Sequence, residues 1–169
     1  MTFGMIRGLL GSVALLVLVG CGTAQHKSSV VADFKPAAAT KIDVGDVVNS
    51  TKETFDIDIV KMMQTSLTDK LRSQSLLAAE GSGQRLTIVS TIVEYSKGNA
   101  FARWLVPGLG ATILTVRCKL LDGTREVGSV DATRNVFMGG GYSIGTWKTI
   151  FDSIASDVVT ELRSKLPNT

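Results

Sequence analysis

The sequence has few of the residues from which most metal centres and nucleophilic active sites are built. It holds one histidine and two cysteines in 169 residues, and aromatic residues make up only 6%. A zinc site needs several Cys, His or carboxylate ligands that converge, and a serine or cysteine nucleophile needs a base held beside it. The sequence therefore predicts no metal, no cofactor and no enzymatic activity.

Charge of one sign is not concentrated anywhere in the chain. The 18 Lys and Arg residues are balanced by 15 Asp and Glu residues, and no run of five like charges occurs. Proteins that bind nucleic acid usually carry a dense basic patch or stripe. The scattered charge therefore predicts that nucleic acid is not a partner.

A long apolar run is found only at the start of the chain. Residues 8–20 are apolar or small, and one positive charge, Arg7, precedes them. The run is too short for a stable spanning helix, which needs about 20 apolar residues. A basic start, a short apolar run and small residues at its end are typical of a secretory signal peptide, which we place at residues 1–20. Loss of Arg7 with this segment would lower the net charge from +3 to +2.

The end of the signal peptide, Leu18-Val19-Gly20-Cys21, resembles the bacterial lipobox. The resemblance implies that a diacylglycerol is attached to the Cys21 sulfur, that cleavage precedes this residue, and that the new amino terminus gains an N-acyl chain. Two or three chains anchor a protein firmly to a membrane, whereas one does so only marginally. Gly22 follows instead of the Asp that favours inner-membrane retention, so the expected location is the outer membrane, facing the periplasm.

Residues 21–40 are mostly small and polar, and we interpret them as a lipidated, flexible tether. His26 lies in this segment, where a flexible chain could not hold it beside a nucleophile. Residues 41–169 are then expected to form a single domain.

The domain alternates between two kinds of apolar periodicity. Apolar residues recur every three or four positions from Ile59 to Leu71 and from Trp147 to Leu166, which predicts two amphipathic helices. Ser50 or Thr51 is the expected cap of the first, and residues 81–83 its expected end. Strands are predicted at residues 41–48, 85–95, 112–121 and 126–138.

This β-α-β-β-β-α order predicts an α+β fold. Its most economical form is an antiparallel sheet of about four strands with both helices packed on one face. Along residues 112–121, Cys118 shares the apolar face, so we expect a small buried hydrophobic residue rather than a nucleophile. Arg117 and Lys119 are expected on the open face of the sheet.

The segment Lys97-Gly98-Asn99-Ala100-Phe101-Ala102-Arg103-Trp104, with Gly108-Leu109-Gly110-Ala111 and the strand that leads to Asp122-Gly123-Thr124, resembles a known group. These are bacterial envelope lipoproteins catalogued as domain of unknown function 4410. The resemblance spans about Lys41 to Leu166 and is most specific from Ala102 to Gly110. Pro107 interrupts the apolar stretch, and the turn at Asp122 is shorter than expected. Because the group has no assigned activity, it supplies no catalytic residues.

The connection between the second and third predicted strands is unusually apolar, where polar turn residues would be expected. It either folds over the sheet edge or is presented to a membrane or a partner. Its arginine would suit a phosphate headgroup or an acidic partner. The candidate interaction surface consists of Phe101, Arg103, Trp104, Leu105 and Leu109.

Two functions fit these observations. The first is a lipid-anchored, non-catalytic interaction or assembly module of the cell envelope, whose partners would be the membrane and an unidentified envelope protein. The second is a periplasmic carrier that shelters an apolar ligand such as a lipid between helices and sheet. A carrier needs an apolar cavity of roughly 300 Å³ or more, whereas an assembly module should be solidly packed with an exposed patch.

Overall fold

The computed structural model describes residues 23–105, 110–136 and 145–166. Its helices and strands, in chain order, are β1 (Thr23–Val30), β2 (Lys41–Asn49), α1 (Ile59–Ser73), β3 (Arg85–Ser96), α2 (Ala100–Leu105), β4 (Thr112–Asp122), β5 (Arg125–Val136) and α3 (Thr146–Lys165).

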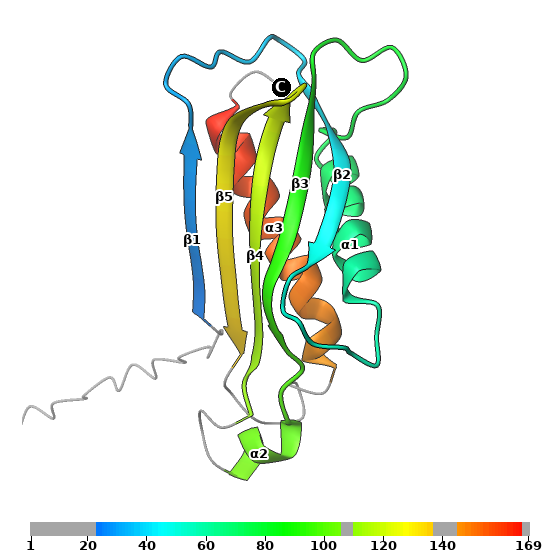
Figure 1. Cartoon of the computed structure of the whole chain (residues 1–169), viewed down its shortest axis with the longest axis vertical. Helices are drawn as coiled ribbons and strands as arrows, with labels where there is room; N and C mark the ends of the chain where they lie inside the picture. The colour runs from blue at the N-terminus through cyan, green and yellow to red at the C-terminus, as the bar shows by residue number, and fades with distance from the viewer. Residues whose placement is uncertain (1–22, 106–109, 137–144, 167–169) are drawn as a thin grey trace, which may run out of the picture.

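The strands form one five-stranded sheet in the order β1-β5-β4-β3-β2, and both long helices cover the same face of it (Figure 1). The α+β class and the one-sided helix layer are as predicted. The sheet has five strands rather than about four, and it is mixed rather than antiparallel. The mixed character arises because β2 and β3 run parallel, joined by the crossover helix α1.

The additional strand, β1, lies within residues 21–40, where the sequence predicted a flexible tether. Thr23–Val30 pairs antiparallel with β5 along its whole length, from Thr23 opposite Asn135 to Val30 opposite Gly128. Most of its side chains are exposed, so it has no apolar alternation to reveal it. An edge strand of this kind is held mainly by backbone hydrogen bonds, which any non-proline sequence can make.

The start and the end of α1 also differ from the prediction. The N-cap is Asp58, whose carboxylate accepts a hydrogen bond from the Lys61 backbone nitrogen at 2.9 Å, and the helix ends at Ser73 rather than at residues 81–83. Thr51 instead donates its own backbone N–H to the Asn49 side chain, in a local turn. The cap therefore falls directly before the first apolar residue of the stripe, Ile59, as the geometry of capping requires.

The core lies between the sheet and the two helices. Strand β4 alternates as predicted, with Leu114, Val116, Cys118 and Leu120 buried and Arg117 and Lys119 exposed on the open face. From the helix side, the largest buried contributors include Met63, Leu67, Leu71, Phe151, Ile154 and Val158. Deleting a buried residue of this size costs about 2–5 kcal/mol, so this layer supplies much of the stability.

Among the described residues, none of the helices has the length and apolar character required to span a membrane.

Candidate interaction surface at the α2 end

The short helix α2 is mounted on the ends of β3 and β4. Asn99 caps it: its side-chain oxygen accepts hydrogen bonds from the backbone N–H groups of Phe101 at 2.9 Å and Ala102 at 3.1 Å. The Asn99 N–H in turn donates to the carbonyl of Gly110 at 2.9 Å. Gly110 has φ +66, and a Cβ there would lie 2.6 Å from the Asn99 carbonyl oxygen, so a glycine is needed. The base of the connection is therefore held by hydrogen bonds and by a close approach of the two strand ends.

Phe101 and Leu105 project from α2 into solvent. Their exposed fractions are 66% and 57%. They are four residues apart on a helix and therefore lie on the same side of it. The sequence left two alternatives for this segment: packing over the sheet edge, or exposure to a membrane or a partner. Phe101 and Leu105 are exposed, which agrees with the second alternative.

The other predicted members of the surface are only partly described. Arg103 and Trp104 belong to α2, but their side chains lie outside the described part of the structure. Leu109 lies outside the described residues, and so does the predicted lipidation site, Cys21.

The tertiary structure adds residues to this surface that the sequence analysis did not connect with it. Trp147, at the start of α3, has the Lys97 ammonium 4.7 Å and the Lys148 ammonium 5.0 Å from its ring centroid. Lys97 also forms an ion pair of 2.7 Å with Asp56 and thereby lowers the pKa of that carboxyl. Hereafter the α2 end means Phe101, Leu105, Lys97, Trp147 and Lys148.

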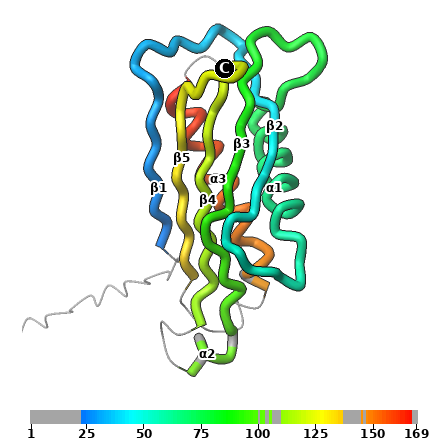
Figure 2. Tube along the Cα trace, in the orientation of Figure 1, coloured from blue at the N-terminus to red at the C-terminus, as the bar shows by residue number. Residues whose placement is uncertain are grey.

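The N-terminal strand begins at this same end of the sheet. Thr23 of β1 pairs with Asn135, Asn135 with Ile113, and Ile113 with Ser96, so one row crosses four strands. Ser96 is the last residue of β3, and α2 follows four residues later. The Cα trace shows the start of β1 and α2 toward the same end of the molecule (Figure 2).

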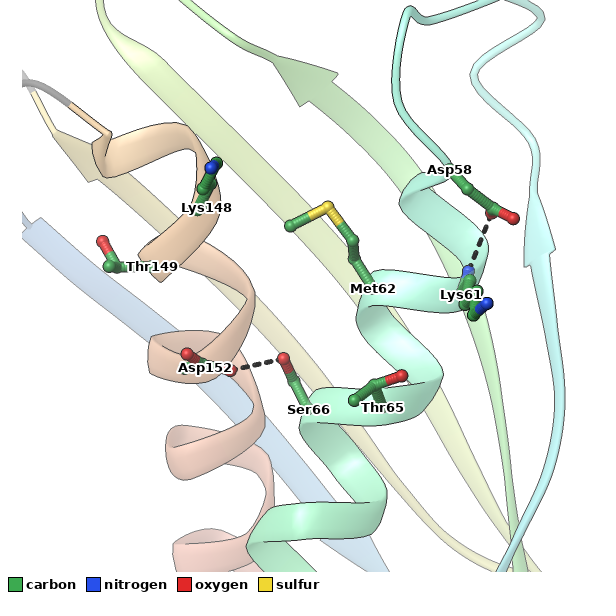
Figure 3. Close-up of a pocket in the computed structure, with 8 residues that line it drawn as sticks. All are labelled: Asp58, Lys61, Met62, Thr65, Ser66, Lys148, Thr149 and Asp152. Atoms are coloured by element: carbon green, nitrogen blue, oxygen red, sulfur yellow. Dashed lines mark hydrogen bonds between the residues drawn. The ribbon is translucent and has the colours of Figure 1, made fainter.

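A second feature is an open groove of about 420 Å³ between α1 and α3. Seven of its eight lining residues are polar or charged, and Met62 is the exception (Figure 3). Across it, the Ser66 hydroxyl donates a hydrogen bond of 2.5 Å to Asp152, which ties the two helices together. Among the described residues that line the groove there is no histidine.

The single histidine is held in place, contrary to the prediction, because it lies on β1. Its Nε2 is 3.9 Å from a carboxylate oxygen of Glu161 on α3. Glu161 also accepts a hydrogen bond from Ser28 and lies 4.0 Å from the Lys165 ammonium. These contacts fasten β1 to α3.

Cys118 is buried, as predicted from its place on β4. Its sulfur lies 3.3 Å from the Ser90 hydroxyl on the neighbouring strand. Burial raises the pKa of the thiol to about 12, and the Asp131 charge adds to the rise. A thiol with this pKa stays protonated at neutral pH and is not a nucleophile.

Burial also raises the pKa of the Tyr95 hydroxyl to about 12, with a further contribution from the Asp56 charge. The ring packs between Phe55, at 5.0 Å between centroids, and Phe151, at 5.3 Å. Tyr95 is therefore a core residue. Across the described ranges, no three His, Cys, Asp or Glu side chains gather in a way that could hold a metal ion.

These features define a two-layer α+β domain whose α2 end lies toward the same end of the sheet as the start of its first strand. The chain belongs to the family described as a domain of unknown function (DUF4410), whose model matches residues 29–140. This confirms the resemblance seen around Ala102 to Gly110.

Two solved structures share the fold. A dodecamer of a PelC point variant from Paraburkholderia phytofirmans is 18% identical, with a TM-score of 0.58, and the match covers 83% of this chain and 97% of that one. A PelC dodecamer from the same organism is 16% identical, with a TM-score of 0.57 and the same coverage. At these identities the likeness concerns the fold alone. The comparison with curated proteins finds no significant match.

Proposed function

We propose that this protein is a lipid-anchored, non-catalytic assembly module of the bacterial cell envelope. The observation that carries the proposal is the position of β1. Only Gly22 stands between the lipobox cysteine, Cys21, and the first residue of the sheet. A lipid on Cys21 would therefore hold the folded domain directly against the bilayer in a restricted orientation. A long flexible linker would not restrict the orientation in this way.

Self-assembly is the form of interaction that the comparisons favour. The two structures that share the fold are dodecamers, and the match covers nearly the whole of their chains. The sheet ends at β2, whose outer side pairs with residues 76–78 at Ile42 only, so the rest of this strand is the edge at which a neighbouring copy could add. Val48 on that strand is 53% exposed, which leaves an apolar side chain where a neighbouring copy would pack.

The alternative function, a carrier of an apolar ligand, has less support. The groove between the helices is large enough, but it is open to solvent rather than enclosed. A lipid carrier buries its cargo among apolar side chains. Between helices and sheet, the space is instead filled by the buried core residues.

The proposal is tested on the full chain expressed in a bacterium with its signal. Intact-mass measurement of the membrane-extracted protein should show cleavage before Cys21 and the added mass of a diacylglycerol and an acyl chain. The Cys21→Ser protein should lack both. Light scattering of the detergent-extracted protein should show an oligomer, and fractionation should place it in the outer membrane. A mature chain without lipid would contradict the proposed anchor. A monomer at every concentration would contradict self-assembly.

A further inference from the structure

We propose that the α2 end is a second membrane contact, which acts with the lipid on Cys21 to seat the domain on the bilayer in one orientation. This inference deepens the proposed function and rests on it for the lipid anchor. The strands would then point away from the membrane, and the turn between β4 and β5 would be the part farthest from it.

The chain geometry places the anchor and α2 on the same side. Two residues span at most about 7 Å, so the Cα of Cys21 lies within that distance of the Cα of Thr23. Thr23 and Ser96 stand in one row of the sheet, three strand spacings apart, which is about 15 Å. Helix α2 extends beyond the strand ends at this side (Figure 1). A bilayer that holds the acylated Cys21 is therefore within reach of α2.

The exposed side chains suit a membrane interface. Phe101 and Leu105 present apolar groups from one side of α2, on a base fixed by Asn99 and Gly110. Trp147, at the start of α3, lies beside the ammonium groups of Lys97 and Lys148. Tryptophan with flanking lysines is typical of the headgroup region, where the ring is half immersed and the ammonium groups meet anionic phosphates.

A lipid surface fits this end better than a second copy of the chain. A stable protein interface buries roughly 800 Å² on each partner, far more than two apolar side chains on a short helix provide. A membrane needs no such area, because the covalent lipid already supplies the attachment. The apolar residues then have only to set the orientation of the domain.

The test uses the mature lipoprotein reconstituted in vesicles of phosphatidylethanolamine and phosphatidylglycerol. Cys118 is buried, so a cysteine introduced at an exposed position is the one reactive thiol once Cys21 is acylated. An environment-sensitive fluorophore is attached to Phe101→Cys and, as the matched control, to Thr124→Cys in the turn after β4. Thr124 is exposed, and the 11 residues of β4 place it about 36 Å from the α2 end.

The fluorophore at position 101 should shift to the blue in vesicles and lose several-fold more intensity to nitroxide-labelled lipids than the one at position 124. Adding Leu105→Asp should reduce that quenching, whereas Thr160→Asp, at an exposed position toward the far end of α3, should leave it unchanged. Equal quenching at 101 and 124 would overturn the proposal. So would a blue shift at 101 without lipid quenching, because that result identifies a second copy as the occupant.

Intact mass separates this inference from the proposed function. If the protein carries the lipid and position 101 is not quenched, the anchor stands and the α2 contact is wrong. If the protein carries no lipid, the anchor is wrong. The Cys21→Ser forms of the two labelled proteins, in which the introduced cysteine is the one reactive thiol, are then attached to the vesicles through an N-terminal polyhistidine tag and a nickel-chelating lipid. Quenching at 101 supports the α2 contact, and its absence overturns it.

Discussion

Arg134 on β5 and Asp157 on α3 form a two-pronged ion pair, with nitrogen–oxygen distances of 2.6 and 2.7 Å. Their side chains are 30% and 15% exposed, so the pair is partly shielded from water. It joins the last helix to β5, the strand next to the edge strand β1. Bidentate geometry of this kind fixes the relative position of the two elements as well as stabilising them.

Replacing Asp157 by Asn should lower the free energy of unfolding by about 1–3 kcal/mol, because the partly buried Arg134 guanidinium loses its charged partner. Urea denaturation measures the change. The matched control is Asp69→Asn, which removes the exposed Arg72–Asp69 pair within α1 and should cost no more than about 0.5 kcal/mol. Equal losses in the two variants would show that the Arg134–Asp157 contact is no stronger than a surface pair.

The alkaline stability of the domain should depend on Cys118. Its pKa is raised from 9.0 to about 12 in the folded protein, so the folded state keeps a proton that the unfolded state releases. The stabilisation is complete below pH 9 and is lost as pH rises toward 12, by at most about 1.4 kcal/mol per pH unit.

Urea midpoints of the wild type should therefore fall more steeply between pH 9 and 11 than those of Cys118→Ala. Both proteins should retain the decline due to Tyr95, whose pKa is raised from 10.0 to about 12 in the folded state. Parallel curves for wild type and Cys118→Ala would contradict the assignment of a buried, protonated thiol.

The exposed residues of α2 should contribute little to folding. The double change Phe101→Ser and Leu105→Ser should shift the free energy of unfolding by less than about 0.5 kcal/mol, as surface substitutions do. Phe151→Ala, in the core, should cost about 3–5 kcal/mol. Thermal melts of both proteins make the comparison. A loss of several kcal/mol from the α2 variant would mean that the segment packs on the domain.

The docking of β1 should be sensitive to Gly128 on the neighbouring strand. A Cβ at Gly128 would lie 3.0 Å from the Ser29 carbonyl oxygen and 3.4 Å from a methyl group of Val30. Gly128→Val should therefore push β1 from the sheet edge, at a cost of about 1–3 kcal/mol, as overpacking does.

Hydrogen exchange should then show faster exchange of the Thr23–Val30 amides, while α1 keeps its protection. Gly83→Val is the control, since nothing lies within 4 Å of a Cβ at that position. Unchanged exchange in β1 would mean that the strand tolerates the added side chain, and a uniform rise across the domain would mean that β1 does not unfold separately.

Local patterns in the sequence determined much of the helix-and-sheet layer. The stripes that begin at Ile59 and Trp147 became α1 and α3, and the alternation along Thr112–Asp122 placed Cys118 inside. These features follow from the sequence because each arises from the 3.6-residue or two-residue repeat of one element with one buried face. The family resemblance was carried in the same way by a local segment, Ala102 to Gly110.

Only the tertiary structure decided the rest. Strand β1 has polar, exposed side chains and is held by backbone pairing with β5, which leaves no periodic signal. The parallel direction of β2 follows from the crossover through α1. The α2 end brings Trp147 to Lys97 across 50 residues and sets the start of β1 in the same row as the end of β3. Such neighbours depend on strand order and register, and these are set by the packing of the whole sheet rather than by any one segment.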